Sequence, residues 1–142
     1  MNMEIPETPS DLVGAIFAFL SEKRATFPAN DPLIHESIYY AISSCTSCTK
    51  SDYYLKELLF TSNDYYHYSP IIELTMDNLQ MTGFLKCNNP DLKVFEFPEG
   101  KIRHLYETNS KKFFTKDDEL EIKSIADIVS DKLGKYQHAT TP

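Results

Sequence analysis

The chain of 142 residues has no hydrophobic run close to the roughly 20 residues that a membrane-spanning helix needs. Its first residues, MNMEIPETPSDL, contain acids and prolines where a secretory signal would have a basic patch and a long apolar stretch. We therefore expect a cytoplasmic protein without a membrane partner. With 42% hydrophobic residues, the chain is long enough to build one core, and two separate domains are not expected.

Signatures of catalysis are also missing. The chain has no nucleophile elbow, P-loop, HExxH or dinucleotide-binding glycine pattern, and its four glycines leave little material for a phosphate-binding loop. His35 and Glu36 are adjacent, but neighbours on a helix point about 100° apart and would not orient each other as a catalytic pair. We predict a protein that is not an enzyme, with no catalytic residues and no cofactor.

Cysteine is scarce and odd in number, at Cys45, Cys48 and Cys87. Without an export signal a disulfide framework is not expected, and reduced thiols are the default. Cys45 and Cys48 have the spacing of a zinc-binding or redox pair. However, no second Cys or His pair completes a four-ligand site, and the C-terminal end of a helix does not activate a thiol. We interpret both as buried or incidental thiols and predict no metal site.

Positive charge is in short supply as well, because the formal net charge is −7 and the isoelectric point is near 5.0. Between positions 31 and 83 there are seven acidic and two basic residues, a net charge of −5. A basic surface supplies most of the affinity of unspecific nucleic-acid binding. The composition therefore disfavours, without excluding, a nucleic-acid partner.

Helical periodicity is the clearest pattern that the sequence does contain. Apolar residues three and four positions apart, bounded by Pro, Ser, Thr, Asp and Gly, predict helices over 12–24, 32–45, 52–60, 70–82 and 115–133. Asp31 is the expected cap of the second helix, and Gly134 is expected to end the last one. We expect a flexible tail over 1–8, a single domain over 9–134 and a frayed tail over 135–142.

The segment from Tyr68 to Phe97 combines a helix, a glycine stop and a hairpin. Ser69 is the predicted N-cap, Pro70 suits the first helical position, and Gly83 suits the left-handed residue that ends a helix. Beyond it, residues 84–87 and 92–97 are predicted strands, joined by the turn-forming residues 88–91. The stretch over 61–70 is expected to be a turn-rich linker.

The helices over 32–45, 52–60 and 70–82 and the hairpin over 84–97 resemble the three helices and the wing of the winged helix-turn-helix superfamily. The phrase LTMDNLQMTGFLKCNNPDLKVFEF is similar to the join that such proteins place between recognition helix and wing. The resemblance implies an α+β, mostly helical, winged-helix-like domain with a β-hairpin and a C-terminal packing helix. The same fold serves both as a DNA-binding regulator and as a protein-binding module.

The candidate recognition helix departs from the DNA-binding pattern, which presents basic or amide side chains to the major groove. Its expected outward residues include Glu73 and Asp77, and no Lys or Arg lies between Lys56 and Lys86. The alternative nevertheless stays open: a dimeric transcription regulator that pairs through its last helix. It would contact phosphate through Lys86, Lys93, Lys101 and Arg103.

Tyrosine is abundant in the first half of the chain, and it suits contact surfaces because it buries much area at little entropic cost. In the pairs Tyr39-Tyr40 and Tyr53-Tyr54 both rings cannot face inward, so one alternative is that one packs and the other lies on the surface. The other is a protein-binding face formed by Tyr65, Tyr66, Tyr68, Tyr40 and Tyr54. We predict a small interaction or regulatory protein that acts through protein contacts with an unidentified partner.

Overall fold

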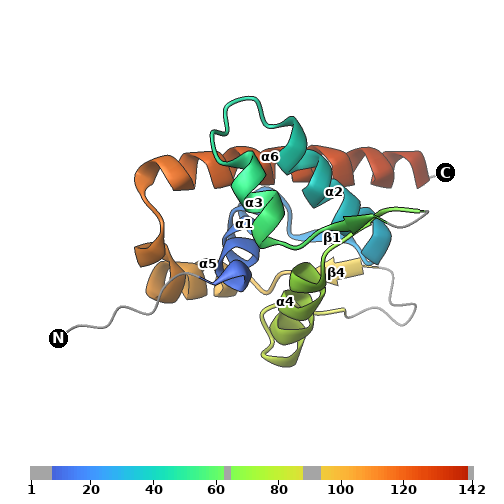
Figure 1. The fold of residues 1–142 in the computed structure, drawn as a ribbon. Coiled ribbons are helices and arrows are strands. Elements are labelled where there is room, and N and C mark those ends of the chain that lie inside the picture. The colour runs from blue at the N-terminus through green and yellow to red at the C-terminus, as the bar shows by residue number, and fades with distance from the viewer. Residues whose placement is uncertain (1–7, 63–64, 88–93, 141–142) are drawn as a thin grey trace.

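The computed structural model describes residues 8–62, 65–87 and 94–140, the last five as backbone only (Figure 1). The described residues form six α-helices and two small antiparallel sheets, which confirms a mostly helical α+β fold. The helices are α1 Pro9–Lys23, α2 Asp31–Ser44, α3 Ser51–Glu57, α4 Pro70–Met81, α5 Lys101–Leu105 and α6 Lys116–Thr140. A π-helical turn, η1 (Tyr106–Ser110), and a 3-10 turn, η2 (Lys111–Phe113), connect α5 to α6.

Helix α1 forms the centre of the molecule and packs against α4, α5 and α6. Eight of its fifteen residues are buried, which makes it apolar on nearly all sides. Helix α6 runs along one edge of the molecule and covers α1 and α2 (Figure 1). Phe17 of α1 lies against the rings of Phe27 and Phe97, with centroids 6.0 and 6.2 Å away.

Local capping explains where the predicted helices begin. The N–H of Ile72 donates to Ser69 Oγ at 3.1 Å, so the predicted cap of α4 is confirmed, and Gly83 after it has φ +82°. Asp31 is not the cap of α2 as expected. Asn30 takes that role, because its Oδ1 accepts the N–H of Leu33 at 3.0 Å and leaves Asp31 inside the first turn.

The predicted hairpin over 84–97 is only partly formed among the described residues, and its turn lies outside them. Lys86 and Glu96 form a single bridge, with N···O distances of 2.9 and 2.7 Å. The main partner of β4 (Val94–Glu96) is instead β1 (Thr26–Pro28), which pairs antiparallel with Phe27 opposite Phe95. This pairing was not predicted, because β1 is only three residues long and includes a proline.

The segment predicted as a linker contains a second small sheet. Strand β2 (Thr61–Ser62) pairs antiparallel with β3 (His67–Tyr68), and the chain passes from β3 through Ser69 directly into α4. We call this segment the β2–β3 hairpin. Isolated two-stranded hairpins are only marginally stable, so side-chain contacts with α2, described below, are needed to hold it.

Gly134 does not end the last helix, and the predicted boundary is wrong. Helix α6 continues to Thr140, and a Cβ built at Gly134 would lie 3.0 Å from Nη1 of Arg24. The same guanidinium Nη1 donates to the carbonyl of Ser130 at 3.2 Å. Glycine therefore leaves room here for the Arg24 guanidinium and does not act as a stop signal.

The apolar side of α6 is used within the chain. Its buried residues Ile122, Ile125 and Val129 face α1 and α2. A dimer through this helix would have to use the outer side, where Leu120 is exposed. In the part of the chain that the structure describes, no helix combines the length and the apolar character required to cross a membrane.

Candidate interaction surface

The outer side of α4 carries two large hydrophobic side chains that nothing in the described chain covers. Leu74 is 52% exposed and Met81 is 84% exposed, whereas Ile72, Met76 and Leu79 are buried. Leu74 and Met81 are seven residues apart, so they lie on one side of the helix about 10 Å apart along its axis. We call this pair the apolar ridge.

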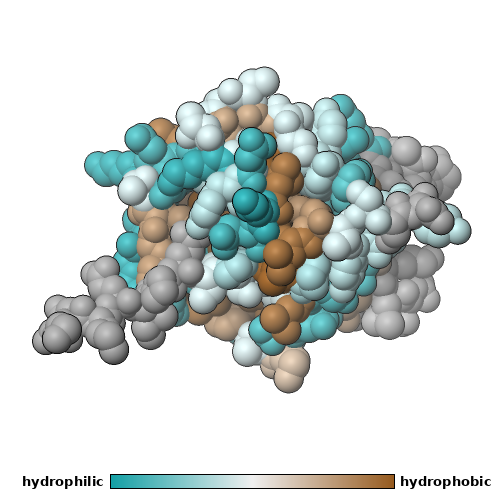
Figure 2. All heavy atoms as spheres, in the orientation of Figure 1, coloured by the Kyte–Doolittle hydropathy of each residue, from teal (hydrophilic) through white to brown (hydrophobic). Residues whose placement is uncertain are grey.

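Hydrophobic residues gather in a strip that runs from the end of α3 down onto α4 in the space-filling view (Figure 2). Leu59, directly after α3, is 56% exposed and has φ +55°. A leucine in this left-handed conformation costs about 1 kcal/mol, and glycine or asparagine is usual at such a position. The preceding residue, Leu58, accepts the hydroxyl proton of Ser69 at 2.6 Å, which places this strained turn beside the start of α4.

Next to the ridge lies a cavity of about 290 Å³ between α4, the start of α2 and β4. Among the described residues its polar lining consists of the carboxylates of Asp31, Glu73 and Asp77 together with Gln80, with no Lys, Arg or His. Its apolar lining is Ala29, Met76, Cys87 and Phe95. We call it the acidic cavity. The ridge and the cavity occupy adjacent sides of the same helix. Residues 73, 77 and 80 line the cavity, and the ridge residues 74 and 81 each follow one of them by one position, so they point to the neighbouring side.

Tyr68 lies within the field of the same carboxylates. Burial raises the pKa of its hydroxyl, and the negative charges of Glu73, Asp77 and Asp31 raise this pKa further. The ring of Tyr68 stacks on His35 with centroids 4.9 Å apart. Strand β3 therefore lies within the electrostatic reach of the acidic cavity.

His35 of α2 is completely buried and holds this surface together. Its Nδ1 accepts the backbone N–H of Ser69 at 3.1 Å, so the ring proton is on Nε2, which lies 3.2 Å from Glu73 Oε2. The neutral imidazole thus links α2 to the first turn of α4. Because both ring nitrogens are occupied, His35 acts as a structural link between helices.

His67 of β3 forms a second link to α2. Its N–H donates to Glu36 Oε2 at 2.8 Å, its Nδ1 lies 3.0 Å from the same oxygen, and its ring stacks on Tyr39 with centroids 3.6 Å apart. His35 and Glu36 therefore bind different partners, which confirms that these neighbours do not orient each other. Together the two histidines anchor the hairpin and α4 to α2.

The structure places the five predicted contact tyrosines in different environments. Tyr65 is 92% exposed in the β2–β3 hairpin, and Tyr66 and Tyr68 are half-buried beside His35. Tyr40 is exposed on α2 but lies over Lys132 Nζ of α6, 4.3 Å from the ring centroid. Tyr54 is buried, with 2% exposure, so its assignment to a contact surface is wrong.

The alternative for the tyrosine pairs describes these helices better. Tyr39 is half-buried where Tyr40 is exposed, and Tyr54 is buried where Tyr53 is exposed. One ring of each pair packs because adjacent helical side chains point in different directions. Of the predicted surface, only the hairpin tyrosines adjoin α4.

The cysteines differ from the expectation of reduced thiols, because Cys45 and Cys48 form a disulfide in the loop between α2 and α3. This expectation was wrong. The turn brings the two Cα atoms to 5.4 Å, within the range that a disulfide spans. Cys87 is free, and the described residues contain no group of three or more metal-ligating side chains.

Two carboxylates of α6 fasten this disulfide loop. Glu121 Oε1 accepts the backbone N–H groups of Thr49 and Lys50 at 2.6 and 3.1 Å, and the Lys50 ammonium lies 2.6 Å from Asp118 Oδ1. Burial raises the pKa of Asp118, but the bonds from Lys50 and Thr115 outweigh this effect and hold the pKa below its usual value. The side chain of Lys50, the N-cap residue of α3, makes no capping hydrogen bond, and Glu121 stabilises the start of that helix from another element.

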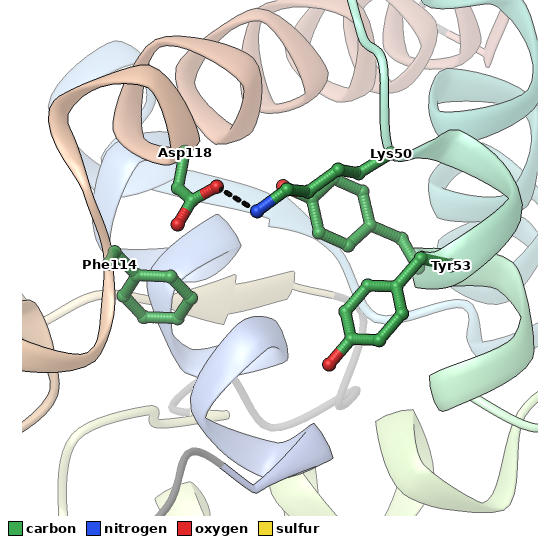
Figure 3. A pocket seen from close by; sticks show the side chains of 5 residues that line it. Lys50, Tyr53, Phe114 and Asp118 are labelled. Atoms are coloured by element: carbon green, nitrogen blue, oxygen red, sulfur yellow. Dashed lines mark hydrogen bonds and ion pairs between the residues drawn. The ribbon is translucent and has the colours of Figure 1, made fainter.

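A second cavity, of about 320 Å³, lies beside this ion pair (Figure 3). Lys50, Tyr53 and Tyr54 line it on the α3 side, and Phe114 and Asp118 line it on the other. The Lys50 ammonium points across the opening toward Asp118, so its two charged groups bind each other (Figure 3). What remains for a ligand is mainly aromatic surface, without a group that would specify its chemistry.

The residues predicted to bind nucleic acid do not form one basic surface in the described part of the chain. Lys86 and Lys101 are exposed, and Lys93 lies outside the described residues. Arg103 pairs with Glu22 and Glu107 at 3.3 and 2.7 Å, and its guanidinium lies 4.6 Å from the ring centroid of Phe19. Its guanidinium is thus paired with two carboxylates of the chain, and its contact with phosphate stays a prediction.

One pattern in the sequence could have located the candidate contact surface more accurately. Leu74 and Met81 are seven residues apart and fall outside the buried stripe defined by Ile72, Met76 and Leu79.

Comparison of the chain with protein-family models, with curated proteins and with solved structures finds no match. The geometry therefore carries the functional argument alone.

Proposed function

We propose that this chain is a small, non-enzymatic interaction or regulatory protein of the cytoplasm, built on a winged-helix-like scaffold, that works by binding another protein. The contact surface is the outer side of α4 together with the β2–β3 hairpin. The partner is recognised by shape, apolar contact and charge, and the chain itself carries out no chemical step.

The order of the elements supports the winged-helix-like scaffold. Helix α1, strand β1 and helices α2 to α4 are followed by the Lys86 segment and β4, and Glu96 is paired with Thr26 on one side and Lys86 on the other. In this interpretation α4 occupies the position of the recognition helix. The sheet packs on α1 through the phenylalanine cluster.

The observation that carries the proposal is the character of the outer side of α4. Where a DNA-binding helix would present basic and amide groups to the major groove, this helix has no basic residue and presents Leu74, Met81 and Asp77. Of the DNA-binding pattern it keeps only the exposed amides of Asn78 and Gln80. Carboxylates repel a phosphate backbone, and exposed leucine and methionine gain free energy only when apolar surface covers them. Both features favour a protein partner.

A dimeric DNA-binding regulator is the weaker proposal. Of its predicted phosphate contacts, Lys86 and Lys101 are exposed, but Arg103 is paired with two carboxylates. Its dimer element, α6, already buries its apolar stripe against α1 and α2. In a DNA-binding regulator, the attraction of the exposed lysines for phosphate would have to outweigh the repulsion between DNA and a chain of net charge −7.

Site-specific photocrosslinking separates the two proposals. A photoreactive amino acid is placed at Met81, on the ridge, and in a matched chain at Leu120, which is exposed on α6. Both chains are produced in the protein's own host and irradiated. The proposed function predicts a discrete protein adduct from position 81 and none of the same size from position 120.

Nucleic-acid adducts from position 81, or a duplex-DNA affinity that falls steeply with salt, would overturn the protein-binding proposal in favour of the regulator. Equal adducts from both positions would show that the outer side of α4 is not a specific contact surface.

A further inference from the structure

We infer that the partner segment bound by α4 is basic and amphipathic, with apolar side chains covering the ridge of Leu74 and Met81 and a lysine or arginine entering the acidic cavity. This inference rests on the proposed function and specifies the chemistry of its partner. The segment would lie across α4 between the ridge and β4.

The ridge defines the apolar half of the segment. Two exposed side chains about two helical turns apart match two apolar side chains on one side of a bound helix or extended peptide. Leu59 lies at the end of α3, next to the cap of α4, and enlarges the same apolar strip (Figure 2). A bulky exposed leucine held in a left-handed conformation costs stability, which is typical of residues retained for contact.

Charge complementarity defines the other half. Asp31 and Asp77 are exposed, and the described part of the chain provides an ion-pair partner for neither. Glu73 is bound to His35 through Oε2. Burial, together with the charges of these three carboxylates, raises the pKa of the Tyr68 hydroxyl, so the field of the carboxylates extends to β3. A cation of the partner would relieve this repulsion.

The shape of the acidic cavity suits a long basic side chain. Its volume is about 290 Å³, which excludes a whole helix or strand but admits the end of one side chain. Met76 and Phe95 offer apolar surface to the methylene groups, and the carboxylates of Asp31 and Asp77 can receive the charged head. Lysine and arginine are the side chains that combine these two properties.

Selection from a displayed library of random 16-residue peptides tests the inference on the full chain. Each selected peptide is then measured by fluorescence polarisation against three paired variants. Asp31→Asn with Asp77→Asn removes the charge, Leu74→Ala with Met81→Ala removes the ridge, and Leu120→Ala with Asp131→Asn is a matched control on α6. Asp31, Asp77 and Asp131 are charged, and the other three substituted side chains are apolar. All six are exposed, so these substitutions should preserve folding.

We expect the selected peptides to be enriched in Lys and Arg beside paired apolar residues, and depleted in Asp and Glu. Each α4 variant should weaken their binding about tenfold, as loss of a central contact typically does, and the α6 control should leave it unchanged. Binding should also weaken with salt for the wild-type chain but less so for the charge variant.

Peptides that depend on Leu74 and Met81 but show no excess of basic residues would overturn the inference and leave the proposed function intact. If no selected peptide depends on either α4 pair, both are overturned. Self-association of the chain that Leu74→Ala with Met81→Ala abolishes would identify a second copy as the occupant and would also overturn the inference.

Discussion

Helices α1 and α4 pack against each other but expose very different amounts of apolar surface. In α1, eight of fifteen residues are buried, and its phenylalanines lie within an aromatic cluster. In α4, four of twelve residues are buried, while Leu74 and Met81 face outward. The hydrophobic side chains of α1 therefore stabilise the fold, whereas two hydrophobic side chains of α4 remain exposed for contact. Substitutions should therefore affect stability at α1 and binding at α4.

The largest effect is expected from Phe17→Ala at the centre of α1. Phe17 is 1% exposed and contacts the rings of Phe27 and Phe97, so its removal leaves a cavity that the close-packed helices cannot fill. The free energy of unfolding should fall by about 3–5 kcal/mol. Urea denaturation measures it, and a loss below about 1 kcal/mol would show that α1 is not the core of the molecule.

His35→Ala should have the next largest effect, because it cuts the link between α2 and α4. The substitution leaves the N–H of Ser69 without its acceptor and the carboxylate of Glu73 without its donor. We expect a loss of about 2 kcal/mol in the free energy of unfolding. Hydrogen exchange would localise the change: amides of α4 and the hairpin should lose protection before those of α1, and uniform loss would contradict the assigned link.

Asp118→Asn tests the fastening of the disulfide loop to α6, and its effect should depend on pH. The folded pKa of Asp118 is lowered, so its charged form contributes stability above the unfolded pKa of about 4, and this contribution is lost as pH falls through the folded pKa. At pH 7 the variant should be less stable by about 1 kcal/mol. The difference between the two proteins should disappear in acid, and a difference that persists there would exclude this ion pair as its cause.

Leu59→Gly should have an effect of opposite sign. Glycine adopts φ +55° without strain, so the free energy of unfolding should rise by up to about 1 kcal/mol in spite of the greater freedom of glycine in the unfolded chain. If Leu59 belongs to the contact strip, the same variant should bind the selected peptides more weakly. A more stable protein that binds equally well would remove Leu59 from the surface.

Met81→Ala should have the smallest effect on folding, below about 0.5 kcal/mol, because the side chain is 84% exposed. Its thermal midpoint should match that of the wild-type chain, whereas its binding of the selected peptides should weaken. A clear loss of stability would mean that Met81 packs in the molecule and that α1 and α4 do not differ as proposed.

Local sequence patterns predicted the helices well because capping and periodicity are local properties. Ser69, Pro70 and Gly83 bound α4 as expected, and Thr115 accepts the N–H of Asp118 at 3.1 Å at the start of α6. The boundaries failed where another element intervenes. Gly134 leaves room for Arg24, the residue that follows α1, and Glu121 of α6 stabilises the start of α3.

The candidate surface was predictable only in its chemical character. The acids of α4 and the shortage of basic residues favoured protein contact from the sequence alone, and the tyrosines near position 65 favoured the segment that leads into α4. Only the packing of the chain shows the role of each side chain. Tyr54 is buried, Tyr68 stacks on His35, and Met81 is exposed.

The sequence by itself thus determined the helices, the cap of α4 and the excess of negative charge, since each depends on residues within a few positions or on composition alone. Only the tertiary structure decided which strand pairs with β4, which partner each histidine binds, and how Asp31 joins Glu73 and Asp77 around one cavity. These features join residues from about 30 to 70 positions apart in the chain, and such contacts follow from how whole elements pack, which local patterns do not encode.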